Sequence, residues 1–196
     1  ARLATVEVDE SSGRISVSVG GGIVDANGVG LNLIGAEAVL RAASGIGGGD
    51  PLETRLGQVA AESIAGGVRL REVDDLIVST IDGLDGVRIL GGDGALELIA
   101  LGSLTVDASI VHDGAGAIRL EGIGIELSVA GSDVTAFGGP IVVDAGSGSL
   151  LMADGARITA VDSIRIVSDA IDLAAMSGIE VTGAAGTIVL GTHTSG

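Results

Sequence analysis

Five aspartates are the residues of this chain whose type and spacing could support acid–base chemistry. Asp74, Asp75, Asp82, Asp85 and Asp93 fall within one short stretch. Polysaccharide lyases and hydrolases use such carboxylates as general acid and base or to bind Ca²⁺. Adjacent side chains on a strand point to opposite faces, whereas in a turn neighbouring aspartates are ordinary. We therefore interpret all five as corner residues and predict no catalytic residue and no enzyme activity.

Two histidines are the candidate ligands for a transition metal. His112 precedes the glycine-rich stretch Gly114–Gly116, which predicts a corner, and His193 lies near the end of the sequence. Metal sites need several His, Cys or carboxylate ligands grouped together, and no such group surrounds either histidine. The sequence predicts two exposed histidines without a metal or cofactor role.

Two glycine-rich stretches resemble parts of ligand-binding loops. Gly91-Gly92-Asp93-Gly94 matches part of the glycine- and aspartate-rich nonapeptide that binds calcium in β-helices, but it occurs once and lacks the downstream aspartate. Calcium binding through this loop, or through another group of corner carboxylates, stays open as an alternative. Gly20-Gly21-Gly22 lacks the following Lys and helix of a phosphate loop. No cofactor-binding or metal-binding residue is assigned.

The amino-acid composition of the chain limits the classes of molecule that it is expected to bind. The chain has 26 acidic residues against 10 basic ones and a net charge of −16, so neither nucleic acid nor an anionic membrane surface is an expected partner. The sequence has no run of about 18 uninterrupted apolar residues, so membrane insertion is not expected. Phe137 is its one aromatic residue, which leaves almost no stacking platform for sugars. Cysteine is absent, so neither a disulfide framework nor thiolate chemistry is expected.

A repeat determines how these residues must be positioned. One short apolar triplet recurs at intervals of 23, 23 and 24 residues, at Ile118–Leu120, Ile141–Val143, Ile164–Ile166 and Ile188–Leu190. A period of this length is typical of stacked coils, in which equivalent residues of successive repeats lie above one another. Function is then expected on the outer surface or in projecting loops.

Alternation within each repeat predicts strands. Apolar–polar–apolar triplets place the outer residues in a core and the middle residue in solvent. Their middle residues are expected to give solubility through opposite charges, with Arg69, Arg88, Arg119 and Arg165 beside Glu97, Glu126, Asp172 and Glu180. Further triplets, among them Leu31-Asn32-Leu33, are read in the same way. Three short strands per coil, about 23 residues per coil and no hexapeptide period predict a right-handed parallel β-helix, an all-β β-solenoid.

The first half of the chain is less regular. We expect residues 1–196 to form a single β-helical segment cut from a longer protein. Residues 45–66 interrupt the pattern, and we predict an enlarged coil or protruding loop there in preference to an independent helix. Residues 80–86, with Asp82, Gly83, Asp85 and Gly86, predict a turn.

Part of the chain resembles the repeats of large bacterial exoproteins related to filamentous haemagglutinin. The resemblance covers residues 13–78, and the remaining sequence is similar in style. Its motifs are Gly13-Arg14-Ile15-Ser16-Val17, Gly22-Ile23-Val24-Asp25, Val39–Gly47, Asp50–Thr54, Gly66–Leu70 and Asp74–Val78.

The resemblance implies a secreted, right-handed β-helical shaft of an adhesin, located outside the cell or on the bacterial cell surface. It implies a structural or adhesive role, with a host or neighbouring-cell receptor or glycan bound through the parent protein, and it transfers no catalytic residue. The amino-terminal secretion motifs of such proteins are not seen in the sequence. Two alternatives stay open: a polysaccharide-binding or polysaccharide-degrading β-helix, and end-to-end self-association through exposed coil ends.

Overall fold

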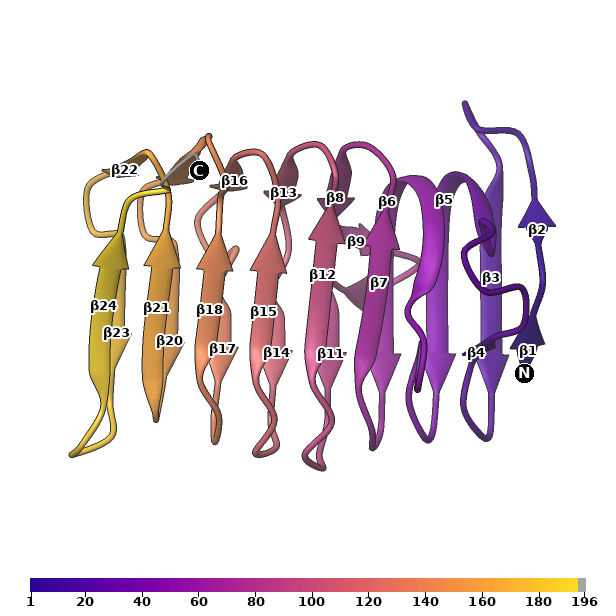
Figure 1. Cartoon of the computed structure of the whole chain (residues 1–196), viewed down its shortest axis with the longest axis horizontal. Coiled ribbons are helices and arrows are strands. Elements are labelled where there is room, and N and C mark those ends of the chain that lie inside the picture. Colours follow the sequence, from indigo (N-terminus) through magenta and orange to yellow (C-terminus); the bar gives the residue numbers. More distant parts are fainter. Residues whose placement is uncertain (194–196) are drawn as a thin grey trace.

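The computed structural model describes residues 1–193 and shows a rod of about eight stacked coils (Figure 1). The described residues form strands that pair in parallel, apart from one antiparallel hairpin, and contain no helix, and so none that could cross a membrane. Successive coils pair in register, as Ile118 with Ile141 and Ile141 with Ile164 show. The predicted repeat is therefore the repeat of the structure.

Each regular coil contributes one strand to each of three walls, named here by their place in Figure 1. The front wall contains β1 (Arg2–Leu3), β4 (Val24–Asp25), β7 (Val68–Glu72), β12 (Leu96–Ala100), β15 (Ile118–Glu121), β18 (Ile141–Asp144), β21 (Ser163–Val167) and β24 (Thr187–Gly191). The top wall contains β8 (Leu76–Val78), β13 (Leu104–Val106), β16 (Ile125–Leu127), β19 (Ser149–Met152) and β22 (Ala170–Leu173). The back wall contains β11 (Val87–Ile89), β14 (Ile110–His112), β17 (Val134–Ala136), β20 (Arg157–Ala160), β23 (Gly178–Val181) and the last residues of β3 (Arg14–Val19), β5 (Leu33–Ala42) and β6 (Leu52–Ser63). The long strand β6 turns corners, because its first residues pair with β7 of the front wall and its middle residues with β8 of the top wall.

The path of the chain makes the solenoid right-handed. In Figure 1 the chain rises along the near strands of the front wall, crosses the top wall, descends along the back wall and advances to the left. That path agrees with the general hand of crossovers between parallel strands. The predicted fold class, a parallel β-solenoid with about 23 residues and three short strands per coil, is confirmed.

The core is a continuous column of aliphatic side chains. The outer residues of the triplets, such as Leu96, Leu98, Ile118 and Leu120, have no exposed surface. Their γ- and β-branched side chains stack on equivalents about 4.8 Å away in the neighbouring coils. Asn32 is an exception to the predicted pattern. It is fully buried although its triplet placed it in solvent, because the chain turns a corner there before β5 begins.

The prediction for residues 45–66 is corrected by the structure. Leu52–Ser63 is strand β6, paired in register with β5, so this segment does not protrude and its coil is not enlarged. The longer coil is the next one, in which Arg69 and Glu97 stand 28 residues apart. Its extra residues form a hairpin of β9 (Thr80–Ile81) and β10 (Leu84–Asp85), where the sequence predicted a turn. The remaining short strand, β2 (Val6–Glu7), pairs with the start of β5.

Candidate functional site

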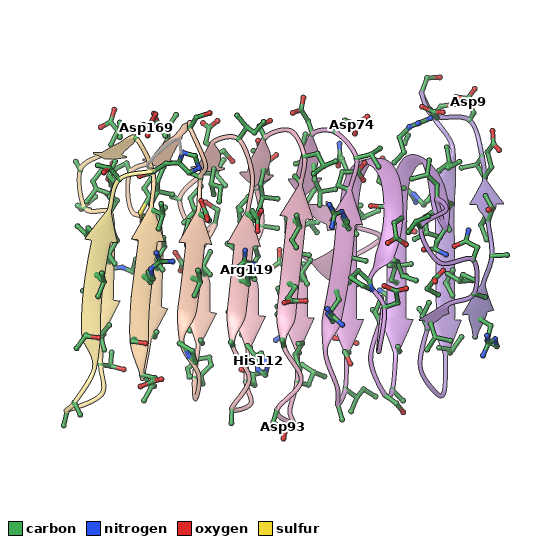
Figure 2. The ribbon with its side chains drawn as sticks, in the orientation of Figure 1. Asp9, Asp74, Asp93, His112, Arg119 and Asp169 are labelled. Atoms are coloured by element: carbon green, nitrogen blue, oxygen red, sulfur yellow. The ribbon has the colours of Figure 1, made fainter. Side chains whose placement is uncertain are left out.

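Asp74 and Asp75 line a groove between neighbouring coils near the first end of the rod. The groove measures about 180 Å³, and Glu10, Arg55 and the backbone around Gly57 complete its lining. Glu10 and Arg55 form a long ion pair, with 3.7 Å between Glu10 Oε1 and Arg55 Nη1. Three coils thus bring acidic residues and one arginine together. Figure 2 shows Asp74 on the upper edge of the rod.

Asp75 is held by the following coil. Its carboxylate accepts hydrogen bonds from the backbone N–H of Ser103 at 2.7 Å and from the Ser103 hydroxyl at 2.9 Å. These bonds stabilise the charged form and lower the pKa of Asp75. Asp75 therefore links the corners of two neighbouring coils, a contact that the sequence did not predict, although it placed Asp75 in a corner.

Glu72 lies behind this groove with no exposed surface. The Thr54 hydroxyl and the Leu56 N–H donate to its Oε2 at 2.7 and 2.9 Å, and the Val73 N–H donates to its Oε1 at 2.8 Å. Burial raises the pKa of Glu72 to about 8, in spite of these donors, and a hydrogen bond shared with Asp74 adds to the rise. At neutral pH the carboxyl group is therefore largely protonated.

Of these two carboxyl groups, one is accessible to solvent and the other is buried and holds a proton. Asp74 is exposed, whereas Glu72 is sealed beneath it. A general acid must come within hydrogen-bonding distance of the group it protonates. Glu72 therefore cannot touch a substrate in this conformation, and its contacts instead join β6 to β7.

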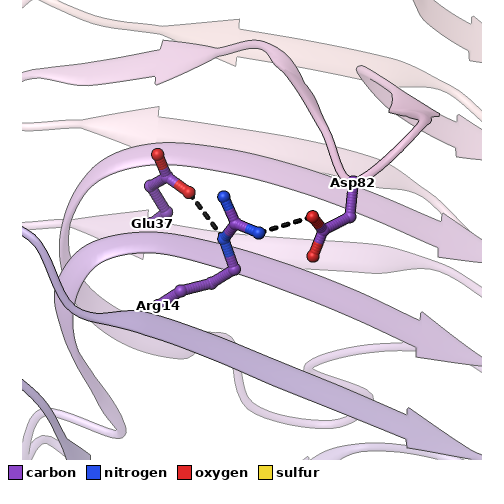
Figure 3. A network of polar contacts seen from close by, with 3 residues as sticks. All are labelled: Arg14, Glu37 and Asp82. Carbon is purple, nitrogen blue, oxygen red and sulfur yellow. Dashed lines mark hydrogen bonds and ion pairs between the residues drawn. The ribbon is translucent and has the colours of Figure 1, made fainter.

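The lateral hairpin is the second irregular feature, and it lies across the outer face of the back wall. Asp82 at its tip has φ of +50° and Gly83 has +71°, as a tight two-residue turn requires. Arg14 on β3 donates from Nε to Glu37 at 2.7 Å and also forms an ion pair with Asp82 (Figure 3). The hairpin thereby reaches back across two coils to the first one.

Apolar contacts beneath the hairpin form a small core outside the solenoid. Ile81 and Leu84 bury Val39 of β5 and Ala60 of β6, whose side chains point outward from the main core. Removing these side chains uncovers apolar surface, whereas the ion pair above them is solvent-exposed.

We expect the apolar contacts to hold the hairpin more strongly than the ion pair. Leu84→Ala should lower the free energy of unfolding by about 2–3 kcal/mol, because a buried leucine is truncated. Asp82→Asn should cost at most about 1 kcal/mol, the usual range for an exposed pair. Urea denaturation of both variants measures the difference. An equal loss in the two would show that the charge network dominates.

The prediction for His112 was wrong. The side chain is fully buried at the end of β14, because Ile110 and His112 share the inward face of that strand. Its Nδ1 accepts from the N–H of Gly114 at 3.0 Å, so the ring proton is assigned to Nε2, which donates to the carbonyl oxygen of Gly94 at 2.7 Å. Both nitrogens are occupied, and His112 ties together the corners of two coils.

The remaining candidate residues do not come together. Asp85 accepts from the hydroxyl of Thr80 within the hairpin at 2.7 Å. Asp93 is an exposed corner residue, and His193 is exposed at the end of the described residues. Among residues 1–193, no three His, Cys or acidic side chains lie close enough to hold a metal ion. Calcium binding stays an untested alternative.

Of the outward charges expected to lie beside one another, only Arg69, Glu97 and Arg119 stack between coils within the described residues, whereas Arg165, Glu126, Asp172 and Glu180 lie in register with uncharged residues. Arg69 pairs with Glu97 at 2.5 Å, and Glu97 lies in register with Arg119 of the next coil. Arg119 in turn contacts Glu121. Exposed pairs of this kind contribute about 0–1 kcal/mol each, so solubility is their main effect.

A polar corner between the first coils was missed in the sequence. The buried Asn32 side chain lies among several oxygens, and its Oδ1 accepts from the N–H of Glu53 at 2.9 Å. Backbone hydrogen bonds, with the bond from Asn27 the largest cause, lower the pKa of Asp25 in this network. The amide Nδ2 of Asn32 lies 2.6–3.1 Å from Leu3 O, Ala4 O, Asp25 Oδ1 and Asn27 Oδ1, and these four acceptors share its two N–H groups.

The chain matches no known protein family, no curated protein and no solved structure. The parallel β-solenoid is thus established by the structure itself, while the likeness to filamentous haemagglutinin rests on the quoted motifs. Neither the groove nor the hairpin acquires a role from a relative.

Proposed function

We propose that this chain is a non-enzymatic shaft segment of a large secreted or surface-displayed bacterial protein. The observation that carries the proposal is the uninterrupted aliphatic core, which continues in register through the stacked coils. Such a core resists bending and supports an elongated shape. In this proposal the parent protein binds a receptor or glycan on a host or neighbouring cell, and the shaft holds that binding region away from the surface.

Deletion of one whole coil tests the spacer role. Removing residues 141–163 joins Pro140 to Ile164, which replaces Ile141 in register. A spacer should refold and become shorter by one coil rise, about 4.8 Å, and its adhesion when displayed as part of the parent protein should persist. Small-angle scattering and cell-adhesion assays measure both properties. Loss of adhesion from a correctly folded deletion variant would contradict the spacer role.

One observation favours a second candidate, a polysaccharide-binding or polysaccharide-degrading β-helix. The groove of Glu10, Arg55, Asp74 and Asp75 gathers acids and an arginine from three of the first four coils, which is the kind of arrangement such proteins need. A glycan array and a reducing-end assay over a polysaccharide panel test it. Binding or cleavage that Asp74→Asn abolishes and Asp154→Asn, an exposed control, leaves intact would replace the shaft proposal.

End-to-end self-association is an additional proposal about partners. The last coil presents Ile188 and Leu190 to solvent, although their register partners Ile164 and Ile166 are fully buried. Exposed apolar side chains at the end of a stack of coils favour association of this segment with a second copy. Sedimentation velocity at several concentrations should show assemblies that Ile188→Asp disperses, and a concentration-independent monomer would exclude them.

A further inference from the structure

The lower edge of the rod differs in composition from its three walls. It consists of the corner segments that join the back wall to the front wall, at residues 64–67, 90–95, 113–117, 137–140, 161–162 and 182–186. Figure 2 shows Asp93 on this edge. Glycine and alanine dominate these segments. The glycines have a structural cause, since a Cβ on Gly114 would stand 1.8 Å from the carbonyl oxygen of Gly92 in the neighbouring coil.

A row of exposed apolar side chains runs along this edge and has no such structural cause. The row contains Ile64, Leu90, Phe137 and Val161, which are 57%, 41%, 58% and 39% exposed. Each follows the last residue of a back-wall strand, and each backbone N–H donates to the preceding coil, as Phe137 does to the carbonyl of His112. The four side chains therefore point outward from equivalent corner positions of the stack.

The identity of these side chains points to a binding surface. Phe137 is the one aromatic residue of the chain, and it is exposed where small residues would satisfy the corner geometry. Aromatic residues are enriched where protein surfaces bind partners, and aligned exposed apolar side chains mark interaction sites. Because the row runs along the rod, a partner that binds it is expected to be elongated and to lie parallel to the rod.

The charge of the lower edge restricts that partner. Its corner segments contain the exposed carboxylates Asp93, Asp113 and Asp162 and no arginine. Asp113 occupies the middle position of the apolar row, between Leu90 and Phe137. A basic partner would neutralise these groups while its apolar side chains cover the row.

We propose that the lower edge is a docking surface for a cationic amphipathic polypeptide segment lying along the rod. A second copy of the chain fits this edge poorly, because two copies meeting there would oppose their carboxylates and each carries a net charge of −16. An anionic lipid surface is repelled for the same reason. The site lies on the shaft itself and is independent of the receptor-binding role proposed for the parent protein.

A designed peptide tests the proposal. The probe is an 18-residue amphipathic helix of Leu and Lys, compared with a peptide of the same composition in shuffled order and with oligolysine. We expect micromolar binding of the amphipathic probe by isothermal titration calorimetry, with much weaker binding of the other two. The double substitution Leu90→Ser and Phe137→Ser should weaken binding at least tenfold. Substituting Asp93, Asp113 and Asp162 with Asn should reduce the dependence of affinity on salt.

Two exposed apolar residues on another corner provide the matched control. Leu101 and Ile123 are exposed to a similar degree at the junction of the front and top walls. The Leu101→Ser, Ile123→Ser double variant should bind the probe as the unsubstituted chain does, and urea denaturation confirms folding of both variants. Equal weakening in the two double variants, equal affinity for the shuffled peptide, or absence of probe binding would each overturn the proposal.

Discussion

Raising the pH from about 5 to 9 should destabilise this protein through one buried group, Glu72. Its folded pKa is about 8, against an ordinary value of 4.5. Between those values the folded chain holds a proton that the unfolded chain has released, so stability falls as pH rises. The contribution is fully present below about pH 4.5 and is lost as the pH passes 8. A rise of this size corresponds to a few kcal/mol.

Glu72→Gln isolates this effect because an amide cannot ionise. At about pH 5 the variant should be about 1 kcal/mol less stable, since an NH₂ group in place of Oε1 cannot accept from the Val73 N–H. At pH 9 the order should reverse, because the unsubstituted chain then carries a buried charge. Urea denaturation at three pH values measures the crossing.

The exposed Glu126 on β16 supplies the control for net charge. Glu126→Gln removes the same formal charge without touching a buried group, so its stability should follow the unsubstituted chain across the pH range. Parallel curves for Glu72→Gln and the unsubstituted chain would contradict the raised pKa of Glu72.

Gly86→Ala should lower the free energy of unfolding more than most other glycine-to-alanine substitutions in the chain. Gly86 follows the hairpin with φ of +61°, and a Cβ there would stand 2.0 Å from the carbonyl oxygen of Ser109 in the next coil. The left-handed backbone costs an alanine about 1 kcal/mol, and forcing the two coils apart adds about 1–3 kcal/mol. We expect a total loss of about 2–4 kcal/mol in urea denaturation.

Gly83→Ala separates the two causes. Gly83 has φ of +71° but open space around the position of a Cβ, so this variant should lose only the backbone contribution of about 1 kcal/mol. If the two variants proved equally stable, close stacking of coils would not be what requires glycine at position 86.

Much of the architecture followed from sequence because one physical rule repeats in every coil. Ile118, Leu120 and their equivalents alternate with polar residues, and the 23-residue interval stacks them, so the core and the three walls could be predicted. The four predicted triplets, at Ile118–Leu120, Ile141–Val143, Ile164–Ile166 and Ile188–Leu190, coincide with β15, β18, β21 and β24 within one residue at their ends.

The alternation of inward and outward residues also applies to two polar residues that the sequence analysis did not place in the core. Val68, Leu70 and Glu72 share one face of β7, and Ile110 and His112 share one face of β14, so alternation alone would have placed Glu72 and His112 inside. The sequence analysis instead assigned His112 to a corner because of the glycines after it, and it assigned no position to Glu72. Only the fold shows that Thr54, Leu56 and Gly94 supply the partners that make their burial tolerable.

The hairpin and the groove could not be predicted because they depend on contacts between different coils. Ile81 and Leu84 have an apolar pattern that is too short to indicate what they cover, and Val39 and Ala60 become partners only through the register of β5 and β6. Glu10, Arg55 and Asp74 are far apart in the chain and meet only because three coils stack.

The wide coils and the hairpin have a mechanical consequence. A coil of about 23 residues advances the rod by about 4.8 Å, yet the same residues pulled straight would span roughly 75 Å. Under tension, peeling one coil would therefore extend that coil to about fifteen times its length along the rod. The work of pulling would be dissipated in this coil while the other coils stay intact. The hairpin packs on Val39 and Ala60 and pairs with Arg14, so it links the longest coil to the three coils before it, and we expect coils outside this group to peel before those inside it.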